Sequence, residues 1–299
     1  MRVLVLGSGA GGGVPQWNCR CPVCSIAWDR PGEVRRRTQT SLALSADDRR
    51  WIVLDAAPDL RQQIIDTPAL HPAGAGRHSP IEAVVLTSGE VDHVAGLLCL
   101  REGHPFSIFA TASALDDIAS SPIFGVLNPD IVARRVLALD RAVSVAGLAV
   151  TPFAVPGKVP LYREGNEVVV GAATEDVVGL EIADDSGHRV AYVPGVAHLS
   201  EDLVARLGAA DVLFLDGTTF TDDELVASGL STKTAGRMGH LPIGGEGGSL
   251  HRFASGTPTN RVYIHLNNTN PVLIETSPER ALVAQAGWEV AHDGMEFVL

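Results

Sequence analysis

The sequence predicts an α/β protein, or α+β by some schemes, whose single domain contains two strand-rich halves. Short apolar runs with the length of buried strands recur in both halves, and several end in polar or charged residues. Helical segments separate these runs. The 299 residues contain no low-complexity linker, no sharp change of composition and no short-period repeat. We therefore predict one domain over residues 1–299.

The first half starts with a sheet. A hairpin is expected where two apolar runs flank the polar turn 47–50, and a loop rich in Pro, Gly and His follows at 67–79. The predicted strands are 3–6, 41–44, 51–55, 83–86, 106–110 and 135–139. The predicted helices are 59–65, 94–98 and 113–120.

The second half repeats this style. Its predicted strands are 148–153, 167–172, 177–182, 189–193, 212–216 and 262–266, and its predicted helices are 201–207 and 278–286. Residues 288–291 and 296–299 flank the turn at Asp293 and Gly294, which predicts a terminal hairpin. Because polar residues at strand ends commonly build active sites, the ends of these strands contain the first candidates for function.

The composition is typical of a packed soluble protein, with 45% hydrophobic and 19% charged residues. The net charge of −12 argues against a broad nucleic-acid surface. Arg35, Arg36 and Arg37 form one dense basic run, which fits either a solvated loop or an anion-binding patch. No stretch approaches the roughly 20 apolar residues of a membrane span, so we expect no membrane insertion and a cytoplasmic location.

Residues 7–12 read GSGAGG and satisfy the dinucleotide fingerprint G-x-G-x-x-G directly after a strand. The fingerprint also requires a helix whose N-terminus receives the pyrophosphate. Residues 13–19 continue as loop instead, so we reject nucleotide binding and expect a tight glycine loop near the active site.

Three cysteines lie within six residues, in the pattern CRCPVC at 19–24. Cys19, Cys21 and Cys24 supply three of the four ligands of a tetrahedral zinc, and we predict a cysteine-rich structural zinc loop at about residues 15–30. Buried thiols without metal and a redox-active pair are the alternatives. Spacing does not identify the fourth ligand, for which His240, Cys99 and Asn268 are candidates in that order.

Residues 86–93 read LTSGEVDH and join a buried strand to a helical segment. This stretch resembles the T-H-x-H-x-D-H signature of the metallo-β-lactamase superfamily, with Asp92 and His93 at its last two positions. Residues 54–59 (LDAAPD), which include Asp55, look like the early strand-plus-aspartate element of the superfamily, and residues 263–266 (YIHL) look like the late strand that ends in a ligand histidine. The match spans most of the chain. The resemblance implies a four-layer αββα sandwich.

The chain departs from the superfamily pattern at four places. Ser88 and Glu90 replace the first two histidines of the signature. Residues 151–158 lack the usual mid-chain histidine, and residues 192–196 lack the metal-bridging aspartate. These losses argue against a standard dinuclear zinc hydrolase.

Within the superfamily, four features together are similar to the family of pyrroloquinoline quinone (PQQ) biosynthesis protein B. They are the CRCPVC run, the altered signature at 88–93, RMGHLP at 237–242 and HLNNTNP at 265–271. The resemblance implies a role in maturing a peptide-derived quinone cofactor, or in carrying PQQ or a precursor towards the periplasm. The expected partner is a small peptide-derived precursor, and a homodimer is also open.

The residues themselves support one metal site with Asp92, His93 and His265 as ligands. Two imidazoles and one carboxylate form the facial triad of non-haem Fe(II) oxygenases, although zinc or manganese accepts the same donors. Glu90 and Asp216 are candidate additional oxygen ligands. The alternatives are a helix cap at Asp92 beside a satisfied histidine, and an Asx turn at Asp216.

Other candidates surround this set. His240 is expected to orient substrate, shuttle protons or bind the structural zinc. An acidic substrate requires polar and cationic partners, for which the sequence offers Ser88, Arg37, Lys158 and Lys233. His198 and His251 are expected at the surface or in a supporting layer.

Combined with the role that the resemblance implies, these residues suggest the hypothesis of an iron-dependent hydroxylase, with Asp92, His93, His265 and His240 as its catalytic residues. It would insert oxygen into the tyrosine-derived ring of a cross-linked Glu–Tyr precursor of PQQ. A carrier of PQQ or its precursor explains the eroded signature as well, and predicts binding without metal-dependent turnover. A metal-dependent hydrolase ranks third, because it requires a second metal for which ligands are scarce.

Overall fold

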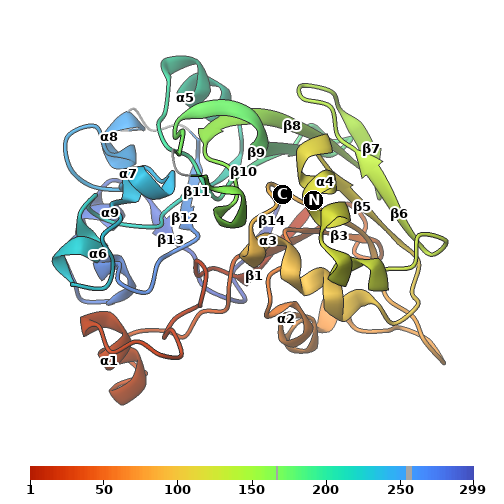
Figure 1. The fold of residues 1–299 in the computed structure, drawn as a ribbon, viewed down its shortest axis with the longest axis horizontal. Helices are drawn as coiled ribbons and strands as arrows, with labels where there is room; N and C mark the ends of the chain where they lie inside the picture. Colours follow the sequence, from red (N-terminus) through yellow and green to blue (C-terminus); the bar gives the residue numbers. More distant parts are fainter. Residues whose placement is uncertain (166–167, 254–257) are drawn as a thin grey trace.

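Two seven-stranded sheets face each other in the computed structural model, which describes residues 1–165, 168–253 and 258–299 (Figure 1). The first sheet has the strand order β14-β1-β2-β3-β4-β5-β6, and the second has the order β13-β12-β11-β10-β9-β8-β7. The first sheet contains β1 (Arg2–Gly7), β2 (Ser41–Ser45), β3 (Trp51–Leu54), β4 (Ile81–Val85), β5 (Phe106–Ala110), β6 (Val132–Val136) and β14 (Glu296–Val298). The second contains β7 (Val143–Val145), β8 (Leu148–Gly157), β9 (Ala172–Ala183), β10 (Arg189–Val193), β11 (Val212–Asp216), β12 (Asn260–Ile264) and β13 (Glu289–Val290).

Helices cover the outer face of each sheet. Those beside the first sheet are α2 (Leu60–Asp66), α3 (Val91–Val94) and α4 (Ala112–Ser120), while α1 (Pro22–Asp29) lies apart from them in the ribbon (Figure 1). The later helices are α5 (Glu201–Leu207), α6 (Glu224–Ala227), α7 (Ala235–Met238), α8 (Ser249–Arg252) and α9 (Pro278–Gln285). Short 3-10 helices are η1 (Pro68–Leu70), η2 (Ala95–Leu100), η3 (Pro122–Val126), η4 (Leu161–Arg163) and η5 (Pro271–Leu273).

Three apolar cores separate the four layers. The central core joins the inner faces of the two sheets, where Leu42 and Ile52 share one cluster with Leu180 and Phe214. A second core packs α2, α3 and α4 onto the first sheet, and a third packs α5 and α9 onto the second. Strands that are buried on both faces have continuous apolar sequences, which is why β3, β4 and β11 could be predicted from the sequence. The predicted αββα sandwich is confirmed.

Parallel pairing places the ends of several strands at one edge of each sheet. Strands β3 to β6 pair in parallel in the first sheet, and β10 to β13 pair in parallel in the second. Open parallel sheets bind ligands outside the carboxyl ends of their strands. The segments that follow β4, β11 and β12 therefore contain the candidate site.

The predicted terminal hairpin is wrong. Strand β13 pairs with β12 in the second sheet, whereas β14 pairs with β1 in the first. The turn at Asp293 and Gly294 therefore carries the chain from one sheet to the other. Both edges offer unpaired backbone groups, and the alternating pattern of a short strand does not reveal which edge it joins.

Three other elements show the main differences from their predicted bounds or type. The strand expected at 135–139 is β6, which ends at Val136, although Leu137 is buried just beyond it. Of the strand expected at 167–172, residue 167 lies outside the described residues, 168–170 are not strand, and β9 begins at Ala172. The helix expected at 94–98 is mostly the 3-10 helix η2. Periodicity locates such elements but leaves their ends uncertain by a few residues.

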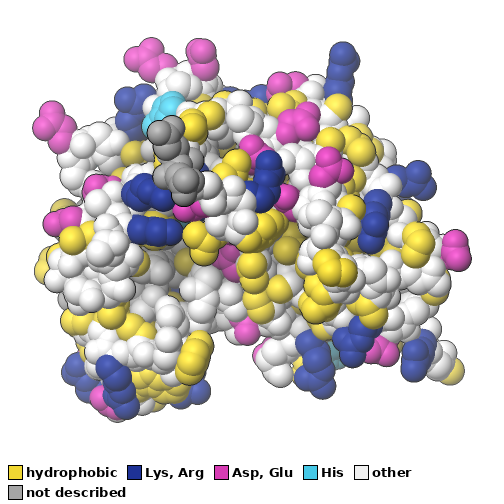
Figure 2. Space-filling model, in the orientation of Figure 1, with side chains coloured by type: hydrophobic (Ala, Val, Ile, Leu, Met, Phe, Trp, Pro, Cys, Tyr) yellow, Lys and Arg dark blue, Asp and Glu magenta, His cyan; other side chains and the backbone are white. Residues whose placement is uncertain are grey.

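On the face seen in Figure 2, Lys and Arg side chains are interspersed with Asp and Glu and do not gather into one broad basic patch. This agrees with the net charge of −12. Every helix in the described parts of the chain falls short of the length and apolar character needed to cross a bilayer.

Candidate functional site

Asp92, His93 and His265 converge between the two sheets. Asp92 and His93 lie in α3, which follows β4, and His265 follows β12 with a left-handed φ of 59°. Oδ2 of Asp92 lies 3.2 Å from Nε2 of His265, and one candidate ligand atom from each of the three residues lies within 4.8 Å of the others. The structure thus brings together the two imidazoles and the carboxylate that the sequence singled out. Their role as metal ligands stays a prediction.

A buried threonine fixes the His93 ring. Oγ1 of Thr87 donates to Oδ2 of Asp55 at 2.8 Å and lies 2.9 Å from Nδ1 of His93. Because the hydroxyl hydrogen points to the carboxylate, the hydroxyl oxygen accepts from Nδ1–H, which leaves Nε2 as the free lone pair. Tyr192 also donates to Asp55, at 2.9 Å. Burial alone would lower the pKa of His93, but the charges of Asp55 and Asp92 raise it.

The same arrangement recurs at His265. Oγ1 of Thr218 donates to Oδ1 of Asp216 at 2.7 Å and lies 2.9 Å from Nδ1 of His265. Nε2 of His265 is therefore free on the side that faces Asp92. Such supporting hydrogen bonds set the tautomer and the ring orientation of metal-binding histidines. Burial opposes ionisation of Asp92, yet His93 and His265 hold the pKa of this carboxyl well below its usual range.

His240 belongs to a second group that shares His265. Nδ1 of His240 lies 2.8 Å from Oδ2 of Asp216, and the His240 and His265 rings stack with centroids 5.3 Å apart. Asp216 also accepts the backbone N–H of Val196 and of Thr218, so the predicted Asx turn is present as well. Asp216, His240 and His265 place candidate ligand atoms within 4.8 Å of one another. Asp216 can therefore hold the histidine rings in place or serve as a metal ligand.

Glu90 does not join either group in the described part of the chain. Its Oε1 lies 3.1 Å from Nζ of Lys158 and accepts the backbone N–H of Leu161. The expectation of an oxygen ligand at Glu90 is therefore corrected, because the carboxylate is already neutralised by a neighbouring lysine. Ser88 lies 3.1 Å from Nδ1 of His93 and thus supports this ring.

The site opens into a cavity of about 380 Å³. Lys158 and Lys233 line it, whereas Arg37 is 3% exposed and donates to the carbonyl oxygens of Ala291 and Arg35. Arg37 is therefore corrected to a structural residue, because its guanidinium is used within the fold. The glycine loop also reaches the cavity, where a Cβ on Gly11 would lie 3.3 Å from Oδ2 of Asp92.

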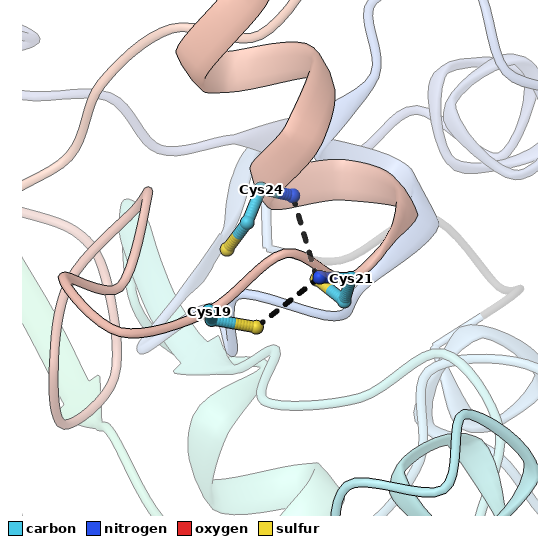
Figure 3. Close-up of side chains that lie close together, drawn as sticks. All are labelled: Cys19, Cys21 and Cys24. Atoms are coloured by element: carbon cyan, nitrogen blue, oxygen red, sulfur yellow. Dashed lines mark hydrogen bonds between the residues drawn. The ribbon is translucent and has the colours of Figure 1, made fainter.

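The three clustered cysteines are buried in the loop before α1 and at its start (Figure 3). Their sulfur atoms lie within 4.8 Å of one another. The backbone N–H of Cys21 donates to Cys19, and that of Cys24 donates to Cys21. Hydrogen bonds from Cys21 and Asn268 lower the pKa of Cys24 to about 5 against the effect of burial. Three buried thiols that converge in this way fit three of the four ligands of a tetrahedral zinc ion.

Asn268 is the fourth residue at the cysteine cluster. Its side-chain Nδ2 lies 3.2 Å from Sγ of Cys19 and of Cys24, and its backbone oxygen lies 3.4 Å from Sγ of Cys21. A half-turn of the amide would bring Oδ1 to the place of Nδ2, so Asn268 offers an oxygen ligand from either group. The first two candidates are corrected, since His240 contacts Asp216 and Cys99 donates to a carbonyl within η2.

Several supporting residues were missed as members of the site. Thr87 and Thr218 were not proposed, although each lies within two residues of the end of a buried strand. Asp55 was noted only as part of a superfamily pattern. A hydroxyl or carboxylate that acts on another side chain leaves no spacing signal in one sequence. His198 and His251 are exposed, as expected of surface residues.

The fold and the site define the class of protein. A family model described as "Beta-lactamase superfamily domain" matches residues 50–266. A solved diphosphatase of the PhnP family has the same fold at 20% identity, with a TM-score of 0.70 over 99% of this chain and 97% of that one. The chain is a member of the metallo-β-lactamase superfamily.

Relatives at high identity define the family more closely. A coenzyme PQQ synthesis protein B from Methylobacterium sp. (strain 4-46) is 53% identical over 100% of both chains. One from Xanthomonas oryzae pv. oryzae (strain MAFF 311018) is 51% identical over 100% of both chains. The crystal structure of Zn(2+)-bound PqqB from Methylobacterium extorquens matches with a TM-score of 0.97 and 52% identity over 100% of both chains. The chain belongs to the coenzyme PQQ synthesis protein B family.

Proposed function

We propose that this protein acts in PQQ biosynthesis as a metal-dependent hydroxylase of the tyrosine-derived ring of a Glu–Tyr precursor. The observation that carries the proposal is the convergence of Asp92, His93 and His265 beside a cavity lined by two lysines. The family relationship supports the pathway, and the donor set supports the reaction type.

The donor set fits a single exchangeable metal ion. Asp92 supplies one oxygen, and the free Nε2 atoms of His93 and His265 supply two nitrogens. This is the two-histidine, one-carboxylate set of non-haem iron oxygenases. Iron(II), when bound, would supply the activation of O₂, and zinc or manganese would accept the same donors. Each hydroxylation would place one oxygen atom of O₂ in a ring C–H bond and reduce the other to water, with two electrons and two protons from an external reductant.

The remaining residues have distinct tasks in this proposal. Thr87 and Thr218 hold the two imidazoles in the tautomer that leaves Nε2 free. His240 lines the cavity with Nδ1 held by Asp216, so its Nε2 is available to hold or accept a proton from the substrate. Lys158 and Lys233 face an acidic substrate. The cysteine cluster with Asn268 would hold a structural zinc.

The test uses anaerobically purified protein with Fe(II), O₂, a two-electron reductant such as ascorbate and the cross-linked Glu–Tyr precursor, while the product mass is followed. We expect mass gains in steps of one oxygen for the wild type. Asp92→Ala and His93→Ala should each abolish the gain and the exchangeable iron while the protein stays folded by circular dichroism. The matched control is His251→Ala, because this histidine is exposed and lies away from the cavity.

A carrier predicts a different outcome of the same experiment. The iron-loaded wild type would bind the precursor tightly and leave its mass unchanged. That result, or full turnover by Asp92→Ala, would remove the hydroxylase proposal.

A further inference from the structure

Three cations surround the carboxylate of Glu164, which directly follows η4. Its oxygens lie 3.0 Å from Nζ of Lys158, 3.2 Å from Nη2 of Arg237 and 3.8 Å from Nζ of Lys233. The Glu164 side chain is only 10% exposed. Burial opposes ionisation, yet the contacts with Lys158 and Arg237 hold the pKa of Glu164 below its ordinary value.

The three cations differ in their relation to the cavity. Lys158 and Lys233 line it, whereas Arg237 lies outside its lining and contacts Glu164. Lys158 follows β8, whereas Lys233 precedes α7 and Arg237 lies within it. Glu164 therefore links two walls of the cavity. Both lysines that face the cavity are thus held by a carboxylate of the protein itself.

The charges at this cluster do not cancel. Lys158, Lys233 and Arg237 face Glu164, and Lys158 also pairs with Glu90 at 3.1 Å, so three cations meet two carboxylates. Nη1 of Arg237 is buried and has no hydrogen-bond partner in the described parts of the chain. Arg237 therefore retains the capacity to bind a carboxylate through two parallel hydrogen bonds.

The backbone beside Glu164 is held by other contacts. The hydroxyl of Tyr162 donates to the carbonyl of Gly89 at 2.7 Å, and Arg163 donates to Asp176 at 2.8 Å. The N–H of Leu161 donates to Glu90. These contacts anchor η4 independently of Glu164, so its side chain can change partners without loss of the short helix.

We propose that Lys158 and Lys233 form a carboxylate-binding subsite of the cavity, that Glu164 competes for these lysines, and that Arg237 keeps Glu164 when a substrate carboxylate displaces it. The inference rests on the proposed function in one respect, because a PQQ precursor carries several carboxylates. Glu164 and Arg237 are positioning residues in this scheme, and the two lysines touch the substrate.

The probe is PQQ itself, a quinone with three carboxylates, titrated by calorimetry against the full-length protein. Glu164→Gln should raise the affinity for PQQ by roughly two- to fivefold, the effect of one partly exposed charge pair. Glu246→Gln is the matched control, because it removes the same charge from an exposed loop and should leave the affinity unchanged. Lys233→Ala should lower the affinity by a similar factor.

Arg237 gives the sharper test. Arg237→Ala should weaken PQQ binding, because Glu164 then binds the lysines more tightly. In the Glu164→Gln background the same replacement should have no effect, since no competing carboxylate is left. Equal losses from Arg237→Ala in both backgrounds, or unchanged affinity in Glu164→Gln, would overturn the scheme. Thermal unfolding of each variant separates these outcomes from loss of fold, and Lys233→Ala tests the subsite independently of Arg237.

The two proposals fail in different experiments. Absence of oxygen insertion by the iron-loaded wild type removes the hydroxylase and leaves the binding pattern of the variants untouched. Normal oxygen insertion together with unchanged PQQ affinity in Glu164→Gln removes the subsite alone.

Discussion

At the scale of single residues, the site depends on two threonine hydroxyl groups that hold the histidine rings. Thr87 and Thr218 each donate to a buried aspartate and accept from the Nδ1–H of a histidine. The aspartates are Asp55 and Asp216, both with side chains that are 0% exposed. The same aspartate–threonine pair therefore fixes the tautomer of His93, which follows a strand of the first sheet, and of His265, which follows a strand of the second.

This pair predicts the effect of Thr218→Val. Valine has the shape of threonine but leaves Nδ1 of His265 without its acceptor, so active-site metal affinity should fall roughly ten- to hundredfold. Metal titration of the purified protein measures this change. The control is Thr219→Val, because Oγ1 of Thr219 is buried without a hydrogen-bond partner in the described residues. Equal metal affinity in the two variants would contradict the role of Thr218.

Glu224 predicts a pH dependence of stability. Burial raises its pKa to about 7, although Thr269 and the N–H of Phe220 donate to it. Between the ordinary pKa of 4.5 and about 7, the unfolded chain loses this proton while the folded protein keeps it, so stability falls as the pH rises.

The measurement compares the wild type with Glu224→Gln by urea unfolding at pH 5 and pH 8. The free energy of unfolding of the wild type, relative to the variant, should fall by up to about 3 kcal/mol over this range. A difference that is the same at both pH values would show that the carboxyl of Glu224 titrates normally. Glu246→Gln, at an exposed position, should show no such change.

At the scale of elements, α1 is too short to be stable by itself. It has eight residues, and isolated helices shorter than about 12 residues are marginal in water. Its first turn is capped by the Cys21 sulfur, which accepts the N–H of Cys24, and Val23 and Ala27 bury its inner face. The thiols and Asn268 therefore connect this helix to the segment after β12.

Removal of the zinc ion proposed for the cysteine cluster should loosen this element first. We expect a zinc chelator to speed amide hydrogen exchange in residues 19–29 and in the segment around Asn268. Peptides from β2 and β3 should be unaffected, because these strands are paired on both sides and fully buried. Unchanged exchange in residues 19–29 after complete loss of zinc would show that packing alone holds α1.

The sequence predicted the elements that depend on local patterns. Buried strands such as β4 and β11 gave continuous apolar runs, and Asp92, His93 and His265 each come after the end of a buried strand, where site residues are common. Side-chain partners that are far apart in the sequence could not be predicted from it. Asn268 lies 244 residues from Cys24, and no spacing rule favours it over His240 or Cys99. The burial of Arg37 and the pairing of Glu90 with Lys158 likewise depend on tertiary packing.

At the scale of the whole molecule, the site lies at the junction of the two sheets. Asp92 and His93 follow a strand of the first sheet, and His265 follows a strand of the second. The Asp92–His265 contact of 3.2 Å joins residues 173 positions apart. Phe297 of β14 also packs edge-to-face on Phe214 of β11, with ring centroids 5.7 Å apart. The site therefore exists only when the two sheets are packed together.

If the proposed ligands bind a metal, the bound metal reports that the two halves of the chain have assembled. If the chain is cut at the exposed turn near Asp140, between β6 and β7, one fragment keeps Asp92 and His93 and the other keeps His265 and His240. Neither fragment has the complete ligand set. The second fragment also carries β14, whose place is on the edge of β1 in the first fragment. Fragment complementation would therefore restore the proposed metal site, and a fused bait and prey could be scored by the metal that the reassembled protein retains.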